Sequence, residues 1–158
     1  MPCFPFCIKI KTEKKIIPPC FRLDPHVKLP DKSTEAHLVC DDSSFNRLVL
    51  KRFLNLIGVT VEESSSAKEA IEKIATNGQY AVIWTDFNLG TNGTTDDNMN
   101  GAQLTDYLRK SFDYKGKIII VSGFTDEKTK SLCYDAGVNN FVPKPIDRNQ
   151  IKEISNIV

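Results

Sequence analysis

The stretch Tyr80-Ala81-Val82-Ile83-Trp84-Thr85-Asp86-Phe87-Asn88 decides how this chain folds. Its apolar run is short and rich in β-branched and aromatic residues, a pattern that predicts a buried strand. The run ends at the carboxylate of Asp86, and a polar loop follows. An ionised carboxylate at the end of a buried strand is costly unless a cation or hydrogen-bond donors meet it. We therefore expect other parts of the chain to bring such partners to Asp86.

Strand and helix patterns alternate five times from residue 37 onward. Short apolar runs predict strands at 37–40, 60–63, 80–86, 117–121 and 140–143. Apolar residues at helical spacing predict a helix after each strand. In the first helix these residues are Phe45, Leu48, Val49, Phe53, Leu54 and Ile57. Parallel strands need such crossover helices, so the alternation predicts an α/β fold, a doubly wound five-stranded parallel sheet with helices on both faces.

Polar residues and glycines mark where these helices begin and end. Ser43 or Ser44 can cap the first helix, and the sequence from Ser66 to Glu69 fits a capping box for the second. The third helix is expected at 101–112, and Thr125 is the expected cap of the fourth, which should stop at Gly137. A short last helix should carry its apolar side chains at Ile151, Ile154 and Val158.

Polar side chains follow four of the five predicted strands. Asp41 and Asp42 follow the first, Asp86 ends the third, Ser122 follows the fourth and Lys144 follows the fifth. All carboxyl ends of a parallel sheet lie at one edge, where ligands bind at the point at which the strand order reverses. A lone aspartate after a strand is usually a turn or cap residue, and the acidic pair could simply begin a helix. The occurrence of one polar group per strand end favours a functional site.

Three carboxylates in one pocket repel each other strongly. A shared proton, a hard divalent cation or a salt bridge to Lys144 could relieve the repulsion. Carboxylate and carbonyl oxygens suit Mg²⁺. No cysteine or histidine is available at these strand ends, so a zinc site is disfavoured. A magnesium site with a nucleophilic carboxylate and a lysine fits phosphoryl transfer.

Composition sets limits on the class of protein. The 158 residues are 41% hydrophobic and 26% charged with a net charge of +1, which is ordinary for a soluble domain and too mild to indicate a nucleic-acid partner. No apolar run is long enough for a membrane segment, and no secretory signal is evident. The five cysteines lack C-x-x-C spacing, and although Cys3 and Cys7 could begin a metal site, no complementary pair follows. Reduced thiols and a cytoplasmic location are expected.

The first 36 residues differ from the rest of the chain. They hold six of the eight prolines, several lysines and no sustained periodicity, so 1–36 is expected to be an N-terminal arm or linker before a domain at 37–158. A poorly ordered lead-in is favoured, although the apolar patches at 3–10 and 16–21 could dock on the domain.

Five segments carry a family resemblance: LVCDDSSFNRLVLKRFLNLIG, VIWTDFNLG, MNGAQLTDYLRK, IIIVSGFTD and FVPKPI. In this order they resemble the receiver domain of two-component response regulators over nearly all of 37–158. The resemblance implies a flavodoxin-like sheet with strand order 2-1-3-4-5. It also implies that Asp86 is phosphorylated from a histidine kinase or histidine phosphotransfer protein, and that Mg²⁺ is held by Asp41, Asp42, Asp86 and the backbone carbonyl of Asn88. Lys144 matches the lysine that pairs with the phosphoryl group.

The resemblance also implies a conformational switch. Ser122 matches the switch hydroxyl and Phe141 the switch aromatic, so phosphorylation would change a partner-binding face. Asn88 and Phe124 flank the site and are expected to tune water access, and Lys144-Pro145 is a candidate cis peptide bond. Two features depart from the family pattern: the loop from Asp86 to Gly101 is unusually long, and Gly90 replaces a customary proline.

Three functions compete at this stage. A phosphoacceptor, stand-alone or part of a hybrid histidine kinase, leads; it is not an enzyme beyond its own phosphorylation and autodephosphorylation. A receiver-like binding module that works without phosphorylation is the alternative, but such a module has no need of all these site residues. An aspartyl-nucleophile phosphohydrolase is disfavoured, because its second aspartate would stand where Asn88 lies. The chain stops after the last helix, so no DNA-binding output domain is expected in it.

Overall fold

The computed structural model describes residues 29–30, 33–90 and 99–155. Strands and helices alternate along the described residues. The strands are β1 (Ser33–Cys40), β2 (Val61–Ser64), β3 (Gln79–Asp86), β4 (Lys117–Ser122) and β5 (Asn140–Pro143). The helices are α1 (Ser44–Leu56), α2 (Ala67–Asn77), α3 (Gly101–Ser111), α4 (Glu127–Asp135) and α5 (Arg148–Ser155).

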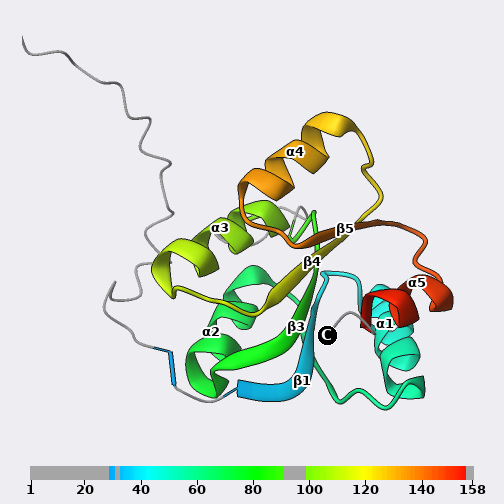
Figure 1. Ribbon diagram of the computed structural model, residues 1–158, viewed down its shortest axis with the longest axis horizontal. Helices are drawn as coiled ribbons and strands as arrows, with labels where there is room; N and C mark the ends of the chain where they lie inside the picture. The colour runs from blue at the N-terminus through cyan, green and yellow to red at the C-terminus, as the bar shows by residue number, and fades with distance from the viewer. Residues whose placement is uncertain (1–28, 31–32, 91–98, 156–158) are drawn as a thin grey trace, which may run out of the picture.

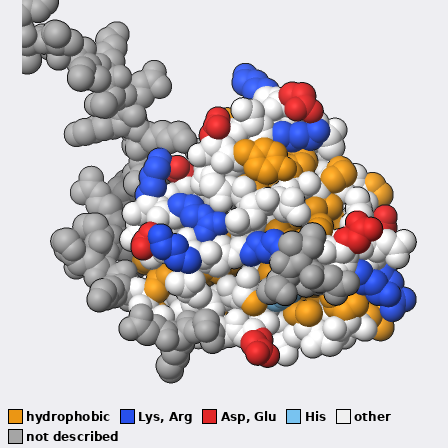
Figure 2. Space-filling view, in the orientation of Figure 1, with side chains coloured by type: hydrophobic (Ala, Val, Ile, Leu, Met, Phe, Trp, Pro, Cys, Tyr) orange, Lys and Arg blue, Asp and Glu red, His pale blue; other side chains and the backbone are white. Residues whose placement is uncertain are grey.

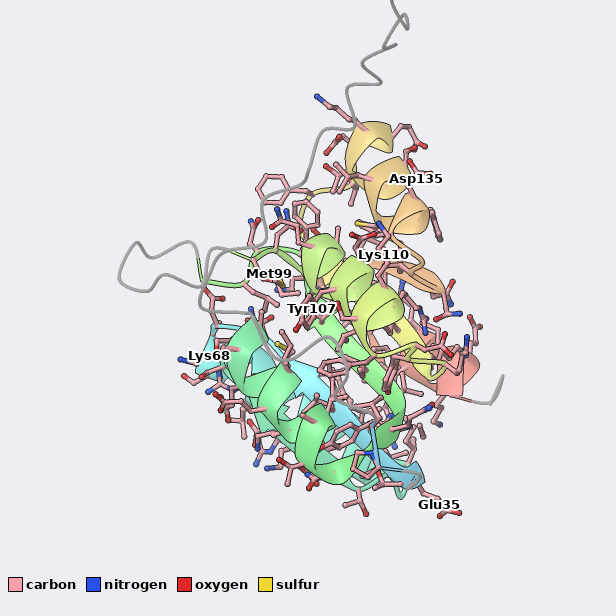
Figure 3. The ribbon with its side chains drawn as sticks, turned by 90° about the vertical axis from the view of Figure 1, so that its left-hand side faces the viewer. Glu35, Lys68, Met99, Tyr107, Lys110 and Asp135 are labelled. Atoms are coloured by element: carbon pink, nitrogen blue, oxygen red, sulfur yellow. The ribbon has the colours of Figure 1, made fainter. Side chains whose placement is uncertain are left out.

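The five strands form one parallel sheet in the order β2-β1-β3-β4-β5. Helices α1 and α5 cover one face of the sheet, and α2, α3 and α4 cover the other (Figure 1). Turned by 90°, the molecule shows α2, α3 and α4 lying side by side across their face (Figure 3). The predicted α/β fold, its strand order and its two helical layers are thus confirmed. The strand order reverses between β1 and β3, so the two strands that end at Asp41 and Asp86 are neighbours.

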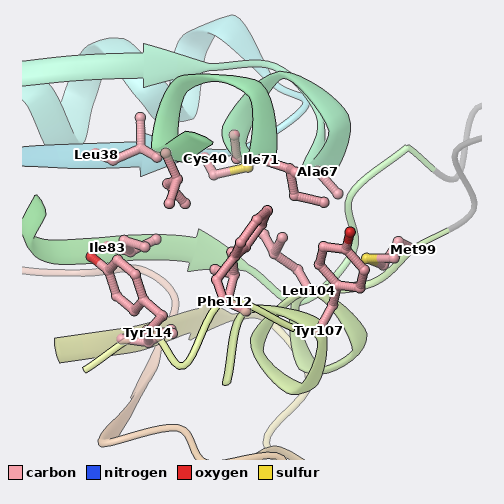
Figure 4. Close-up of a cluster of buried hydrophobic side chains, with 14 of the residues drawn as sticks. Leu38, Cys40, Ala67, Ile71, Ile83, Met99, Leu104, Tyr107, Phe112 and Tyr114 are labelled. Carbon is pink, nitrogen blue, oxygen red and sulfur yellow. The ribbon is translucent and has the colours of Figure 1, made fainter. Parts of the chain in front are cut away.

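Each face of the sheet buries its own apolar core. Beneath α2 and α3, the cluster in Figure 4 joins Leu38 and Ile83 of the sheet to Ile71 and Leu104 of the helices. Beneath α1 and α5, Trp84 packs in a second cluster. Continuous burial from Val82 to Asp86 follows from this arrangement, because both faces of β3 are covered. The central strand therefore holds Asp86 on a rigid support.

Some predicted details are wrong. β1 begins at Ser33, four residues before the predicted start, after which its pairing with β3 shifts register before His37. Asp126, not Thr125, caps α4, because its carboxylate accepts a hydrogen bond from the Thr129 N–H at 2.9 Å. Residues 1–28 and 31–32 of the predicted arm, and Val158 of the last helix, lie outside the described residues.

The apolar residues predicted for the first helix divide between the core and the surface. Leu54 is fully buried, whereas Phe45 is 70% exposed and Leu48 is 51% exposed. Leu50, which was not in the predicted set, is buried instead. The predicted apolar face of α1 is therefore rotated by part of a helical turn from the face that is buried. The helix carries more apolar residues than one face needs, so their spacing alone does not fix which of them are buried.

A buried histidine links the first and third strands under α1 and α5. Nδ1 of His37 accepts a hydrogen bond from the Trp84 indole N–H at 3.1 Å. Burial, with a smaller contribution from the charge of Lys117, lowers the pKa of His37 from 6.5 to about 4. The folded protein therefore holds a neutral imidazole at pH values where the unfolded chain takes up a proton.

We expect this histidine to make stability depend on pH. Its contribution is complete above pH 6.5 and is lost as the pH falls toward 4, because only the unfolded state binds the proton in that window. Between pH 7 and pH 4.5 the loss should be roughly 2 kcal/mol in the free energy of unfolding. Urea unfolding of wild type and His37→Gln at both pH values measures it. The glutamine does not titrate, so equal losses in the two proteins would contradict the prediction.

The face of the molecule drawn in Figure 2 shows no single dominant charge among the described residues. On the face in Figure 2, basic and acidic side chains are interspersed, with apolar side chains between them. In the described part of the chain, no helix has the length and apolar character needed to cross a membrane.

Candidate functional site

Three aspartates meet at the carboxyl edge of the sheet, where the strand order reverses. Each of Asp41, Asp42 and Asp86 places a carboxylate oxygen within 4.8 Å of the others. Lys144 Nζ lies 2.9 Å from Asp41 Oδ2 and 3.1 Å from Asp86 Oδ1. The structure therefore brings together the acidic residues and the lysine that the sequence placed at separate strand ends.

Asp86 is positioned by β3 on one side and by the start of α3 on the other. Its side chain leaves a fully paired central strand and is only 9% exposed as a residue. The Gly101 N–H donates to the Phe87 carbonyl at 2.8 Å, and Asn100 and Gln103 form a capping box that starts α3 there. That capping box was not predicted, although Asn100 stands three residues before Gln103.

Burial raises the pKa of the Asp86 carboxyl above its ordinary value. Lys144 opposes this rise, and the nearby charge of Asp41 adds to it. Lys144 itself loses solvation by burial, but its hydrogen bond to Asp41 and the charge of Asp86 outweigh that cost and raise the pKa of Lys144. The lysine is therefore held as a cation between two carboxylates.

Asp41 is the most heavily hydrogen-bonded of the three acids. Its carboxylate accepts from the Ser43 N–H at 2.9 Å and from the Asn46 side-chain amide at 3.1 and 3.2 Å, besides Lys144. The Arg47 guanidinium donates to the backbone carbonyl of Asp41 at 2.7 Å. Sequence analysis missed Asn46 and Arg47. Their place in the first turns of the helix after the acidic pair was the available indication.

Lys144 reaches the acids from the end of β5. Its backbone N–H donates to the Ser122 carbonyl at 2.8 Å, which ties the end of β5 to the end of β4. The Lys144-Pro145 peptide bond is cis, as predicted. The side chain of Lys144 points to the acidic edge, where its ammonium group contacts Asp41 and Asp86.

The remaining predicted site residues are Ser122, Phe124, Phe141 and Asn88. Ser122 is fully buried, and its hydroxyl accepts a hydrogen bond from the Phe124 N–H at 3.0 Å. Phe124 is 55% exposed, and its ring centroid lies 6.5 Å from that of Phe87. Phe141 is half-buried and packs against the cluster beneath α4, and Asn88, two residues after Asp86, is half-buried. Their roles stay predictions.

A cavity of about 390 Å³ opens beside the acids, between α1 and the segment that follows β5. Asp41, Asp86 and Lys144 line its polar part. Trp84 and Ile146 are among its apolar lining residues. The carboxylate oxygens can thus be approached from solvent, as a reacting group requires.

A doubly wound α/β domain with clustered aspartates and a lysine at its carboxyl edge is a recognisable class of protein. The chain belongs to the response regulator receiver domain family, whose family model matches residues 38–156. It is therefore a receiver domain of two-component signalling, as the sequence motifs predicted.

Relatives of known type include both small and large signalling proteins. The chain is 32% identical over 123 residues to the chemotaxis protein CheY1 of Helicobacter pylori, covering 77% of this chain and 94% of that protein. It is 30% identical over 137 residues to the osmosensing histidine protein kinase SLN1 of Saccharomyces cerevisiae, covering 82% of this chain but 11% of the kinase. It likewise spans 7% of hybrid signal transduction histidine kinase L of Dictyostelium discoideum. The chain thus corresponds to a small part of these two kinases.

Solved structures give the same fold. A response regulator receiver protein from Pseudomonas putida matches with a TM-score of 0.69 and 26% identity, covering 80% of this chain and 99% of that one. A CheY-like receiver domain protein from Methanospirillum hungatei matches with a TM-score of 0.67 and 23% identity, covering 78% and 91%.

Proposed function

We propose that Asp86 accepts a phosphoryl group from a phosphohistidine of a histidine kinase or histidine phosphotransfer protein. The observation that carries this proposal is the position of Lys144. Its ammonium group lies between the carboxylate of Asp41 and that of Asp86, the residue that ends the central strand. A cation held there can neutralise the oxygens of an arriving phosphoryl group. Because the site opens into a cavity, the donor can reach Asp86.

The transfer exchanges one phosphorus bond for another. A carboxylate oxygen of Asp86 attacks phosphorus, an acyl phosphate bond forms, and the bond from phosphorus to the donor imidazole nitrogen breaks. The electron pair of that bond stays on the imidazole, which regains a neutral ring after proton uptake. Lys144 moves no proton here; it stabilises the negative charge on the phosphoryl oxygens.

The donor set fits magnesium. The three clustered carboxylates would hold Mg²⁺, through Asp41, Asp42 and Asp86, with the Asn88 backbone carbonyl as a further ligand. Oxygen donors are the ligands this cation prefers, and the cluster carries more negative charge than Lys144 alone offsets. When bound, the ion supplies positive charge to the phosphoryl oxygens.

The switch proposed from the sequence requires a rearrangement of the loop after β4. The Phe124 N–H donates a hydrogen bond to the Ser122 hydroxyl, so a movement that brings this hydroxyl to a phosphoryl group on Asp86 would also displace the backbone at Phe124. The half-buried Phe141 on the edge strand β5 would respond by turning inward. This movement would change the surface near α4 and β5 that a partner contacts. Asn88 and Phe124, at the rim, would tune water access.

We expect wild-type protein incubated with Mg²⁺ and acetyl phosphate to gain one phosphoryl group, and Asp86→Asn to gain none. The amide of asparagine is not a nucleophile for this transfer, while its size preserves the fold. Intact mass spectrometry reads the gain, and omission of Mg²⁺ should reduce it. Asp135→Asn, which alters an exposed aspartate on α4, is the matched control.

Two outcomes would contradict the proposal. Phosphoryl uptake by Asp86→Asn equal to wild type would place the acceptor elsewhere. A wild type that takes up none from acetyl phosphate or from a phosphorylated phosphotransfer protein would favour the alternative, a binding module that works without phosphorylation.

A further inference from the structure

Asn46 contacts the acidic cluster from the first turns of α1. Its side-chain amide donates to both carboxylate oxygens of Asp41, at 3.1 Å to Oδ1 and 3.2 Å to Oδ2. Ser43, the N-cap of α1, places its N–H on the same Oδ1 at 2.9 Å. Lys144 completes the set on Oδ2 at 2.9 Å. Of the three groups that meet this carboxylate, the Asn46 amide is the one that contacts both of its oxygens.

Neighbouring side chains fix α1 relative to the acids. Arg47 donates to the backbone carbonyls of Asp41 at 2.7 Å and of Asp42 at 3.4 Å. The same guanidinium lies 3.6 Å from a carboxylate oxygen of Glu63 on β2. Asn46 therefore projects from a helix turn whose position is set by two further attachments, so its amide meets Asp41 in a defined orientation.

From these contacts we infer that Asn46 is a positioning residue of the proposed phosphoacceptor site. It holds the Asp41 carboxylate in the orientation in which that carboxylate faces Asp42 and Asp86. Lys144 alone could not do this, because the lysine also contacts Asp86 and must meet the phosphoryl group. The neutral amide holds Asp41 without adding charge, so the cluster keeps its negative charge for the cation. This inference rests on the proposed function.

The consequence concerns the affinity for magnesium. Without the amide, Asp41 keeps the contacts from Ser43 and Lys144 and gains freedom to rotate. Metal binding to the variant must then order the Asp41 carboxylate, which costs free energy. In the native protein this carboxylate is already ordered before the metal binds. Hydrogen-bond partners of metal ligands typically change metal affinity by about tenfold or more when they are removed.

The test is a titration of the protein with MgCl₂ alone. Isothermal calorimetry and the fluorescence of Trp84 each measure the dissociation constant. Trp84 is the one tryptophan of the chain and lines the same cavity as Asp86. We expect the dissociation constant of Asn46→Leu to be about tenfold higher than that of wild type. Asn46→Gln, which keeps an amide on a longer side chain, should lie between the two. Asn55→Leu alters an exposed asparagine of the same helix and should match wild type.

The outcomes separate this inference from the proposed function. Wild-type affinity in Asn46→Leu, or equal weakening in Asn55→Leu, overturns the role of Asn46 and leaves Asp86 as acceptor. Asn46→Gln as weak as Asn46→Leu also overturns it, because the amide is then not the group that matters. If circular dichroism shows that Asn46→Leu does not fold, Asn46→Ala replaces it, with the same expected rise in the dissociation constant. A wild type that does not bind Mg²⁺ refutes the metal site itself, and this inference with it.

Discussion

Replacing Lys144 with alanine is expected to slow phosphorylation by acetyl phosphate about 100-fold, the usual cost of removing one group that stabilises transition-state charge. Lys144 is the cation that bridges Asp41 and Asp86 at the described site. Its loss leaves the carboxylates to repel one another and the arriving phosphoryl group. It also raises the pKa of Asp86 further, because the charge of Lys144 is the largest effect that opposes burial. A protonated Asp86 is a poorer nucleophile.

The measurement is the initial rate of phosphoryl uptake at fixed Mg²⁺, followed by intact mass. Lys152→Ala removes the same charge from an exposed position on α5 and should keep the wild-type rate. A Lys144→Ala rate within the range of this control would show that the lysine has no part in the transfer. A rate lost in both variants would trace the effect to net charge instead.

The fold was predictable because its determinants are local and repeated. The apolar run of β3 predicts a buried strand. The alternation of strands with helices predicts a parallel sheet covered by helices. The acids and Lys144 were predictable for a related reason. A parallel sheet carries every strand end to one edge, so position along the sequence translates directly into position in space.

The features that could not be predicted depend on how each helix is rotated about its axis and on where each strand begins. The contact of Asn46 with Asp41 exists because α1 is turned so that this residue faces the acids, while Phe45 beside it faces solvent. The periodicity of α1 was compatible with either setting. The start of β1 was missed because residues 33–36 contain no apolar run, and their pairing to β3 comes from the neighbouring strand. Backbone pairing of this kind leaves little trace in composition.

Gly101 shows how closely the start of α3 approaches the acceptor, and alanine there is expected to destabilise the fold by about 3 kcal/mol. A Cβ at this position would lie 2.3 Å from the Asp86 carbonyl oxygen and 3.3 Å from the Phe87 Cα. Both neighbours are backbone atoms, so relief requires α3 to move away from the end of β3 and to strain the hydrogen bond from the Gly101 N–H to the Phe87 carbonyl.

Gly123 is the matched control, because a Cβ there would meet nothing within 4 Å. Gly123→Ala should change the free energy of unfolding by no more than about 0.5 kcal/mol, whereas Gly101→Ala should show the full loss in urea unfolding. Equal stability of the two variants would mean that α3 can withdraw from the acceptor without cost. The close approach of Gly101 then would not constrain the position of Asp86.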